Sequence, residues 1–131
     1  MLRTKQLSVT LPNKKGEFAK LAWCLAEAQV NILAVSVLES TEQGTIRLVV
    51  DKPAAAVKAL CDAGMPPIQA NVLLADVPNE VGTLADLAAR LADRGVSIKF
   101  AYGSAAAARG TARVVIGCTN IPVAEDVLKA F

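Results

Sequence analysis

The sequence repeats itself. Residues 11–21 read LPNKKGEFAKL, and residues 77–87 read VPNEVGTLADL, so the second stretch follows the first at an offset of 66. At this offset and without a gap, more than a third of residues 12–50 are identical to their counterparts, Gly44/Gly110 and Arg47/Arg113 among them. A fixed-period match of this length predicts one small structural unit used twice. We therefore expect two domains, residues 1–71 and residues 72–131.

Composition limits the class of protein. The chain is 53% hydrophobic but only 4% aromatic, and its mean hydropathy is +0.41, which is typical of a globular core of aliphatic side chains. Its longest apolar runs fall far short of the roughly 20 residues that a membrane span needs. The net charge of +2 gives no reason to expect nucleic-acid binding. With no apolar leader in the first residues, we expect a cytoplasmic protein.

The first copy has clear periodicity. Residues 6–11 predict a strand that Pro12 and Asn13 end. From Glu17 onward apolar residues fall on one helical face, which predicts a helix of about a dozen residues. Residues 30–40 and 45–50 predict two strands joined as a hairpin. A second helix through Cys61 follows, for which the sequence offers a capping residue, a first-turn proline and a glycine beyond the end: Asp51, Pro53 and Gly64.

The second copy repeats this order and then stops. We expect strands at 72–77, 96–103 and 111–118, and helices at 83–94 and from about 122. The fold class is therefore α+β, with two tandem βαββαβ ferredoxin-like units and antiparallel sheets, the second unit lacking its last strand. Residues 67–77 contain no turn signal, so we expect one long strand that serves both sheets. The second sheet would then have an unpaired edge, which predicts a homodimer or a higher oligomer.

The corner between the first strand and the first helix resembles the ACT domain family. The matching residues are Asn13, Gly16 and Phe18, and the second copy repeats them as Asn79, Gly82 and Leu84. The starts of the following strands, VNI at 30–32 and VSI at 96–98, are also similar to the family. The resemblance covers nearly the whole chain and implies a stand-alone tandem ACT protein. The chain departs from the family's usual Asp-x-Pro-Gly, because it has Asn in place of Asp and Lys15 or Val81 in place of Pro.

The resemblance implies a ligand site at the two corners, completed across a domain or subunit interface by the start of the second strand. The implied ligand-binding residues are Asn13, Lys14, Lys15, Gly16, Glu17, Phe18, Asn31 and Ile32 in the first copy, and Asn79, Glu80, Val81, Gly82, Thr83, Leu84, Ser97 and Ile98 in the second. The unpaired N–H groups at a helix start suit a carboxylate. An asparagine side chain offers both a donor and an acceptor to an amino acid.

A purely structural interpretation of the corners stays open. Asparagine before a helix is often a cap, and glycine there is often a tight turn. Lys14 and Lys15 could hold an anion or could be solvated surface. The two corners are also unlike, since Glu80 and Val81 stand where the first copy has the two lysines. One copy could have kept a site that the other lost.

Residues outside the corners are weaker candidates for a functional site. Trp23 is expected to pack in the core or at an interface, and Arg47 and Arg113, taken as matching strand positions, are expected to face solvent. Residues 103–110 predict a small-residue hairpin loop. Three scattered cysteines are expected to be small buried side chains in a reducing compartment: Cys24, Cys61 and Cys118. The chain has no histidine, which excludes histidine-dependent catalysis and histidine-containing metal sites, and the scattered cysteines make no zinc signature. No metal site and no cofactor are expected.

These observations favour a regulatory, allosteric protein that binds an amino acid or a similar small carboxylate and is not an enzyme. The resemblance implies an enzyme of amino-acid metabolism as its partner. The alternative is an assembly module whose corners bind nothing. A third possibility, a small acylphosphatase-like hydrolase, would require an arginine in the loop after the first strand, and neither corner has one.

Overall fold

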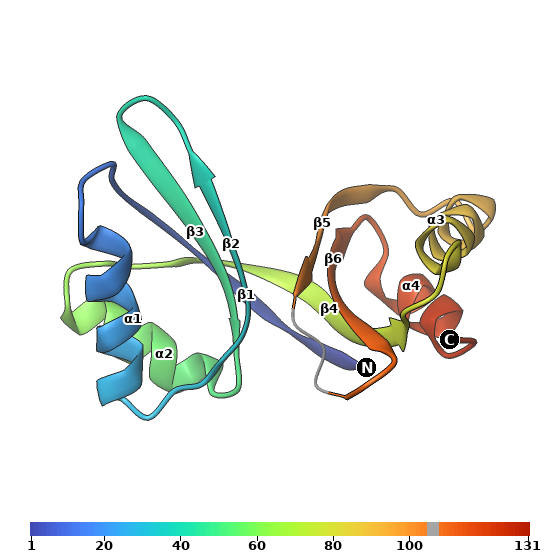
Figure 1. Cartoon of the computed structure of the whole chain (residues 1–131), viewed down its shortest axis with the longest axis horizontal. Helices are drawn as coiled ribbons and strands as arrows, with labels where there is room; N and C mark the ends of the chain where they lie inside the picture. The colour runs from blue at the N-terminus through green and yellow to red at the C-terminus, as the bar shows by residue number, and fades with distance from the viewer. Residues whose placement is uncertain (105–107) are drawn as a thin grey trace. The chain divides into compact units, whose positions relative to one another are not determined.

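The computed structural model describes residues 1–104 and 108–131, in ten elements (Figure 1). They are β1 (Leu2–Pro12), α1 (Glu17–Glu27), β2 (Ile32–Glu39), β3 (Gln43–Val50), α2 (Pro53–Asp62), β4 (Ile68–Pro78), α3 (Thr83–Asp93), β5 (Ile98–Ser104), β6 (Thr111–Cys118) and α4 (Ile121–Leu128). This order confirms the predicted plan of two ferredoxin-like units, the second ending on a helix. Part of the predicted hairpin loop at 103–110 lies outside the described residues.

The chain forms two compact units. The first unit is Lys5–Ala70, and the second unit is Met1–Thr4 together with Asn71–Phe131. Both boundaries fall inside the two 11-residue strands, β1 and β4. The expected single strand through residues 67–77 is therefore present as β4. A division into separately folding domains at residues 71 and 72 stays a prediction.

Each unit has its own strand order. Hydrogen-bonded neighbours follow β2-β3-β1-β4 in the first unit and β1-β4-β6-β5 in the second. The pairs β1/β3, β2/β3, β4/β6 and β5/β6 are antiparallel. Because β4 has β1 as a neighbour and Met1–Thr4 belong to the second unit, the start of β1 takes the place of the missing fourth strand. The prediction that β4 leaves that edge of the second sheet unpaired was therefore wrong.

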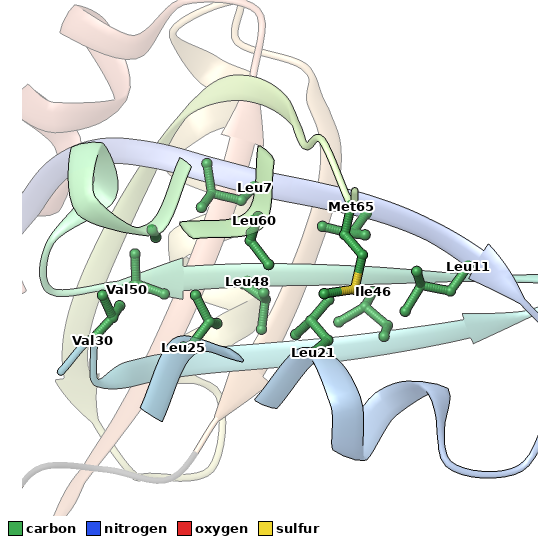
Figure 2. Close-up of a cluster of buried hydrophobic side chains, with 12 residues drawn as sticks. Leu7, Leu11, Leu21, Leu25, Val30, Ile46, Leu48, Val50, Leu60 and Met65 are labelled. Atoms are coloured by element: carbon green, nitrogen blue, oxygen red, sulfur yellow. The ribbon is translucent and has the colours of Figure 1, made fainter. Parts of the chain in front are cut away.

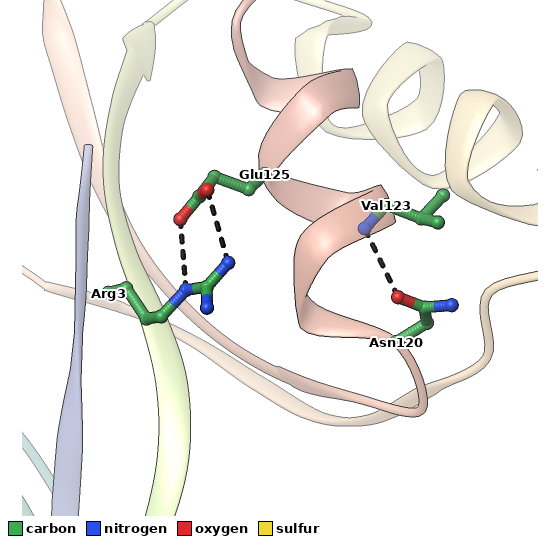
Figure 3. A network of polar contacts seen from close by, with 4 residues as sticks. All are labelled: Arg3, Asn120, Val123 and Glu125. Carbon is green, nitrogen blue, oxygen red and sulfur yellow. Dashed lines mark hydrogen bonds and ion pairs between the residues drawn. The ribbon is translucent and has the colours of Figure 1, made fainter.

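A polar contact holds the start of β1 in the second unit. The Arg3 guanidinium donates to both carboxylate oxygens of Glu125 on α4, at 3.1 and 3.2 Å (Figure 3). At the beginning of the same helix, the Asn120 side chain accepts from the backbone N–H of Val123 at 3.2 Å. Residues 122 positions apart in sequence thus meet in one unit.

Each unit has a separate apolar core on the helix side of its sheet. In the first unit Leu7, Leu21, Leu25, Leu48 and Leu60 are fully buried between the strands and the two helices (Figure 2). The second core is built from their counterparts, namely Leu73, Leu87, Leu91, Ile116 and Leu128. The repeated apolar periodicity in the sequence therefore marks two equivalent cores.

The offset between the repeats changes within the hairpin, between β5 and β6 of the second repeat. The elements from β1 to β2 match those from β4 to β5 at an offset of 66, but β3 (43–50) and β6 (111–118) are offset by 68. Accordingly the backbone N–H of Asn13 donates to the carbonyl of Glu42, and that of Asn79 donates to the carbonyl of Gly110, which lies 68 residues after Glu42. The ungapped pairing of Arg47 with Arg113 and of Gly44 with Gly110 was therefore wrong. Side chains alternate along a strand, so an even shift keeps the same apolar face and hides in the sequence.

Several local predictions also change. Lys52, not Asp51, is the N-cap residue of α2, and the Asp51 carboxylate accepts from the backbone N–H of Asn31 at 2.9 Å. Trp23 is 68% exposed, so it is not a core residue. Cys118 is buried, but Cys61 is exposed, and burial raises the pKa of the partly buried Cys24 thiol.

Candidate functional site

Both predicted corners have the same backbone. Gly16 and Gly82 occupy the N-cap positions of α1 and α3 with φ of 88° and 91°, in the left-handed region that favours glycine. Neither cap position receives a side-chain hydrogen bond. The interpretation of Asn13 and Asn79 as helix caps was therefore wrong. In each case the first backbone N–H groups of the helix face the corner, where the positive end of the helix dipole lies.

The two asparagines differ in their contacts. The Asn13 side-chain Nδ2 donates to Glu39 Oε1 at 2.8 Å and to the carbonyl of Ser40 at 3.3 Å. Both acceptors lie at the end of β2 and in the following hairpin, so Asn13 ties its corner to that hairpin. For Asn79, the described parts of the chain contain no hydrogen-bond partner of the side chain. Of the two corner asparagines, therefore, only that of the first corner has a side-chain hydrogen bond to a described residue.

A cavity of about 440 Å³ opens at the second corner. The second-corner cavity combines residues of the loop and of α3 with residues of the neighbouring strands, which are Val77, Pro78, Asn79, Glu80, Thr83, Leu84, Gly103, Ala112, Arg113 and Val114. Four predicted site residues thus share one cavity. A further cavity of about 370 Å³ borders Val81 and Gly82 on the same corner.

Sequence reasoning missed the strand side of the second-corner cavity. Arg113 was expected to face solvent, but its side chain is only 16% exposed, and its Nε donates to Asp76 Oδ1 at 3.0 Å. Arg113 lies directly opposite Asp76 on the neighbouring strand. At the equivalent position of the first unit Thr10 lies opposite Thr45. Only the register of β4 with β6 reveals this contact, since the two residues are 37 positions apart.

The predicted strand-start residues do not join the corners within a unit. The Asn31 carbonyl accepts from the backbone N–H of Asp51, and the Asn31 N–H donates to the Asp51 carboxylate. The N–H of Ser97 donates to Thr119 Oγ1 at 3.0 Å. Ile32 and Ile98 begin the strands that follow the C-terminal ends of α1 and α3, whereas Gly16 and Gly82 lie at the N-terminal ends. An 11-residue helix is about 16 Å long. One unit alone therefore keeps the two halves of the predicted site apart.

The charges around the second corner are mostly paired. Arg90 on α3 donates to both carboxylate oxygens of Asp86, at 2.9 and 3.1 Å, and its guanidinium lies 5.1 Å from the centre of the Phe131 ring. Its hydrogen bond and charge contact with Asp86 raise the pKa of Arg90. Within the described residues, no group of three or more histidine, cysteine and acidic side chains could hold a metal ion. The same residues include no helix that is long and apolar enough to span a bilayer.

Comparison with solved structures supports the same fold. A crystal structure of a Bacteroides thetaiotaomicron protein is 33% identical, with a TM-score of 0.88, over 98% of this chain and 88% of that one. The ligand-free regulatory subunit of aspartate kinase from Thermus thermophilus superposes with a TM-score of 0.72 at 18% identity, over 99% of this chain and 91% of that one. The corresponding subunit from Thermus flavus gives 0.65 at 20% identity, over 99% and 91%. No curated protein matches the sequence.

A family model extends over almost the entire chain. The model is described as an ACT domain pair, and it matches residues 2–128. The match includes both corners, both helix pairs and all six strands, and it agrees with the duplicated fold that the structure describes. This chain belongs to the family of ACT domain pairs.

Proposed function

We propose that this ACT domain pair is a regulatory protein, not an enzyme, which binds an amino acid or a similar small carboxylate at one or both of its corners. The observation that carries the proposal is the second-corner cavity, because four of the residues that the family resemblance implied line it together. The ligand carboxylate would accept hydrogen bonds from N–H groups of the first helical turn other than those of Glu17 and Thr83, which already donate to the carbonyls of Lys14 and Glu80. The space beside the cap glycine is open, since a Cβ there would meet no atom of the described residues within 4 Å.

The proposed site includes the loop residues of both corners as candidates. Within one unit, the predicted strand-start residues lie at the opposite end of the helix from the corner. They would therefore reach a corner only if it belonged to another unit or another copy of the chain. These residues are Asn31, Ile32, Ser97 and Ile98. Binding would then favour one arrangement of the units or of two copies of the chain. A ligand shifts such an equilibrium only by its difference in affinity for the two states. We propose an enzyme of amino-acid metabolism as the regulated partner, and a cytoplasmic location in keeping with three free cysteines.

Exposed apolar residues favour a homo-oligomer. In the first unit β2 is an edge strand, with Val37 55% and Leu38 49% exposed, and Trp23 on α1 is 68% exposed. An edge strand offers unpaired backbone groups to another chain. We therefore propose a homodimer, which light scattering can test. A monomer at micromolar concentration would contradict it.

A thermal-shift screen against the twenty amino acids tests the proposed function. A ligand at about 100 times its dissociation constant adds roughly 2.7 kcal/mol to the free energy of unfolding. The assembly-module alternative, in which both corners are empty, predicts no shift with any amino acid at millimolar concentration. That result would refute the proposed function.

Substitution of the cap glycines tests the location. Gly82→Val and Gly16→Val each place a branched side chain at a φ near +90°, which costs about 1–2 kcal/mol and blocks the corner. We expect at least one of them to abolish the heat of binding in calorimetry while the protein still unfolds cooperatively. Binding that survives in both variants would place the site elsewhere.

A further inference from the structure

The two asparagines indicate which corner is available to a ligand. Asn13 already binds Glu39 and the carbonyl of Ser40. Asn79 lines the second-corner cavity, and its side chain has no hydrogen-bond partner in the described parts of the chain. A ligand at the first corner would have to displace these contacts, whereas no described residue makes such a contact with Asn79.

The charges of the second-corner cavity also favour a particular ligand. Two charged residues line it, Glu80 and Arg113. Arg113 is held by both carboxylate oxygens of Asp76, at 3.0 and 3.3 Å, which neutralises the pair. Glu80 is exposed and has no ion pair with any described residue. The cavity therefore presents one uncommitted carboxylate, which suits an ammonium group.

Part of the wall of the same cavity is apolar. Val77 on β4, Ala112 and Val114 on β6, and Leu84 on α3 line it. Leu84 is 60% exposed, so a ligand that covered it would remove apolar surface from water. These four side chains offer no partner to a charged ligand side chain, and the Arg113 guanidinium is already paired with Asp76.

We infer that the second corner, not the first, is the binding corner and that its ligand is an α-amino acid with an uncharged aliphatic side chain. This inference rests on the proposed function. Glu80 and Asn79 hold the ammonium group, the start of α3 holds the carboxylate, and the aliphatic side chain lies between Leu84 and Val114. The first corner has Lys14 where the second has Glu80, so it repels the same ammonium group.

Calorimetry on the full chain with leucine, isoleucine, valine, lysine and aspartate tests the inference. Exposed, sequence-equivalent residues give matched variants that keep the fold, namely Glu80→Gln with Lys14→Gln, and Leu84→Ala with Phe18→Ala. We expect an aliphatic amino acid to bind most tightly. Glu80→Gln should weaken it about tenfold or more, and Leu84→Ala about fivefold. The two first-corner variants should change its affinity less than about twofold.

Other results separate the inference from the proposed function. Loss of binding in Lys14→Gln and Phe18→Ala, with the second-corner variants unaffected, would overturn the choice of corner. Preferential binding of lysine or aspartate would overturn the ligand class. Both results leave the proposed function intact. Absence of binding by any of the twenty amino acids would overturn the proposed function and this inference together.

Discussion

The sequence offset between the two repeats is constant as far as the first strand of each hairpin, β2 or β5, and it changes between that strand and the next. From β1 to β2 the first repeat matches β4 to β5 at a constant offset of 66, and from β3 onward the offset is 68. Each unit nevertheless buries equivalent apolar residues on the helix side of its sheet. The pairing of β6 with β4 matches that of β3 with β1, so two additional residues between the strands of a hairpin leave the strand pairing of this duplicated fold unchanged.

One pair of facing residues in the hairpin differs between the two units. In the first unit Ala34 lies opposite Val49. The second unit has Phe100 opposite Gly117, and a Cβ on Gly117 would overlap the Phe100 ring. Both pairs combine a larger residue with a smaller one. The larger residue lies on the second strand of the hairpin, β3, in the first unit and on the first strand, β5, in the second unit. Complementary volume between strands has thus been kept, and the individual residues have not.

The largest expected effects test whether the two cores are equivalent. Leu21 and Leu87 occupy the same helical position and are 0% and 1% exposed. We expect Leu21→Ala and Leu87→Ala each to lower the free energy of unfolding by about 2–5 kcal/mol, measured by urea denaturation. Leu84→Ala, at a 60% exposed position, is the control and should change it by less than about 0.5 kcal/mol. A loss confined to one of the two core variants would show that the cores are not equivalent.

The next effect breaks the volume match in the second unit. Gly117→Val introduces the residue of the first unit at a place that the Phe100 ring fills, so it should destabilise the chain by about 1–3 kcal/mol. The double variant Gly117→Val with Phe100→Ala recreates the small and large pair of the first unit. A double-mutant cycle should therefore show a favourable coupling. Simple additivity of the two changes would refute the idea that they compensate.

A smaller effect is expected from the ion pair that only the second unit has. Asp76→Asn removes the charge opposite Arg113, and because these side chains are 40% and 16% exposed we expect a loss of about 1 kcal/mol. The difference from the wild type should shrink in about 1 M salt, which screens partly exposed charges. Thr10→Ala, at the equivalent position of the first unit, is the matched control. An equal loss in that control would remove any special role of the pair.

The smallest expected difference concerns the corners in the absence of ligand. Asn13→Ala deletes the hydrogen bonds to Glu39 and Ser40 and should cost about 0.5–1 kcal/mol of unfolding free energy. Asn79→Ala deletes no hydrogen bond seen among the described residues, and its effect should stay below about 0.5 kcal/mol. Thermal unfolding of both variants measures the difference. Equal losses of unfolding free energy would mean that the Asn79 side chain makes hydrogen bonds as stabilising as those of Asn13.

Local signals account for what the sequence alone predicts. A proline and an asparagine mark the end of β1, a glycine suits the left-handed corner, and apolar residues at helical spacing mark the buried face of α1. Each of these effects acts within one or two turns of chain. The order of elements, the fold class and the family resemblance therefore follow from the sequence.

Features that depend on distant parts of the chain do not follow from it. The cavity at the second corner requires the register of β4 with β6, and an even shift leaves no trace in the apolar pattern. The bond from Asn13 to Glu39 depends on where the hairpin ends. Likewise, the sequence around Arg3 contains no sign that it meets Glu125. Residues within the corners could be named from the sequence, but their partners could not.

The assignment of Met1–Thr4 to the second unit has a consequence for how the chain can be divided. Cutting it between residues 71 and 72 would give a C-terminal fragment without the strand that neighbours β4 and without the Arg3 guanidinium. The uncovered edge of β4 would then be open to pairing with other chains. The repeats share one sequence pattern, yet the second needs a short segment that is made before the first. In a gene fusion or a circular permutation, Met1–Thr4 would have to be kept together with the second repeat.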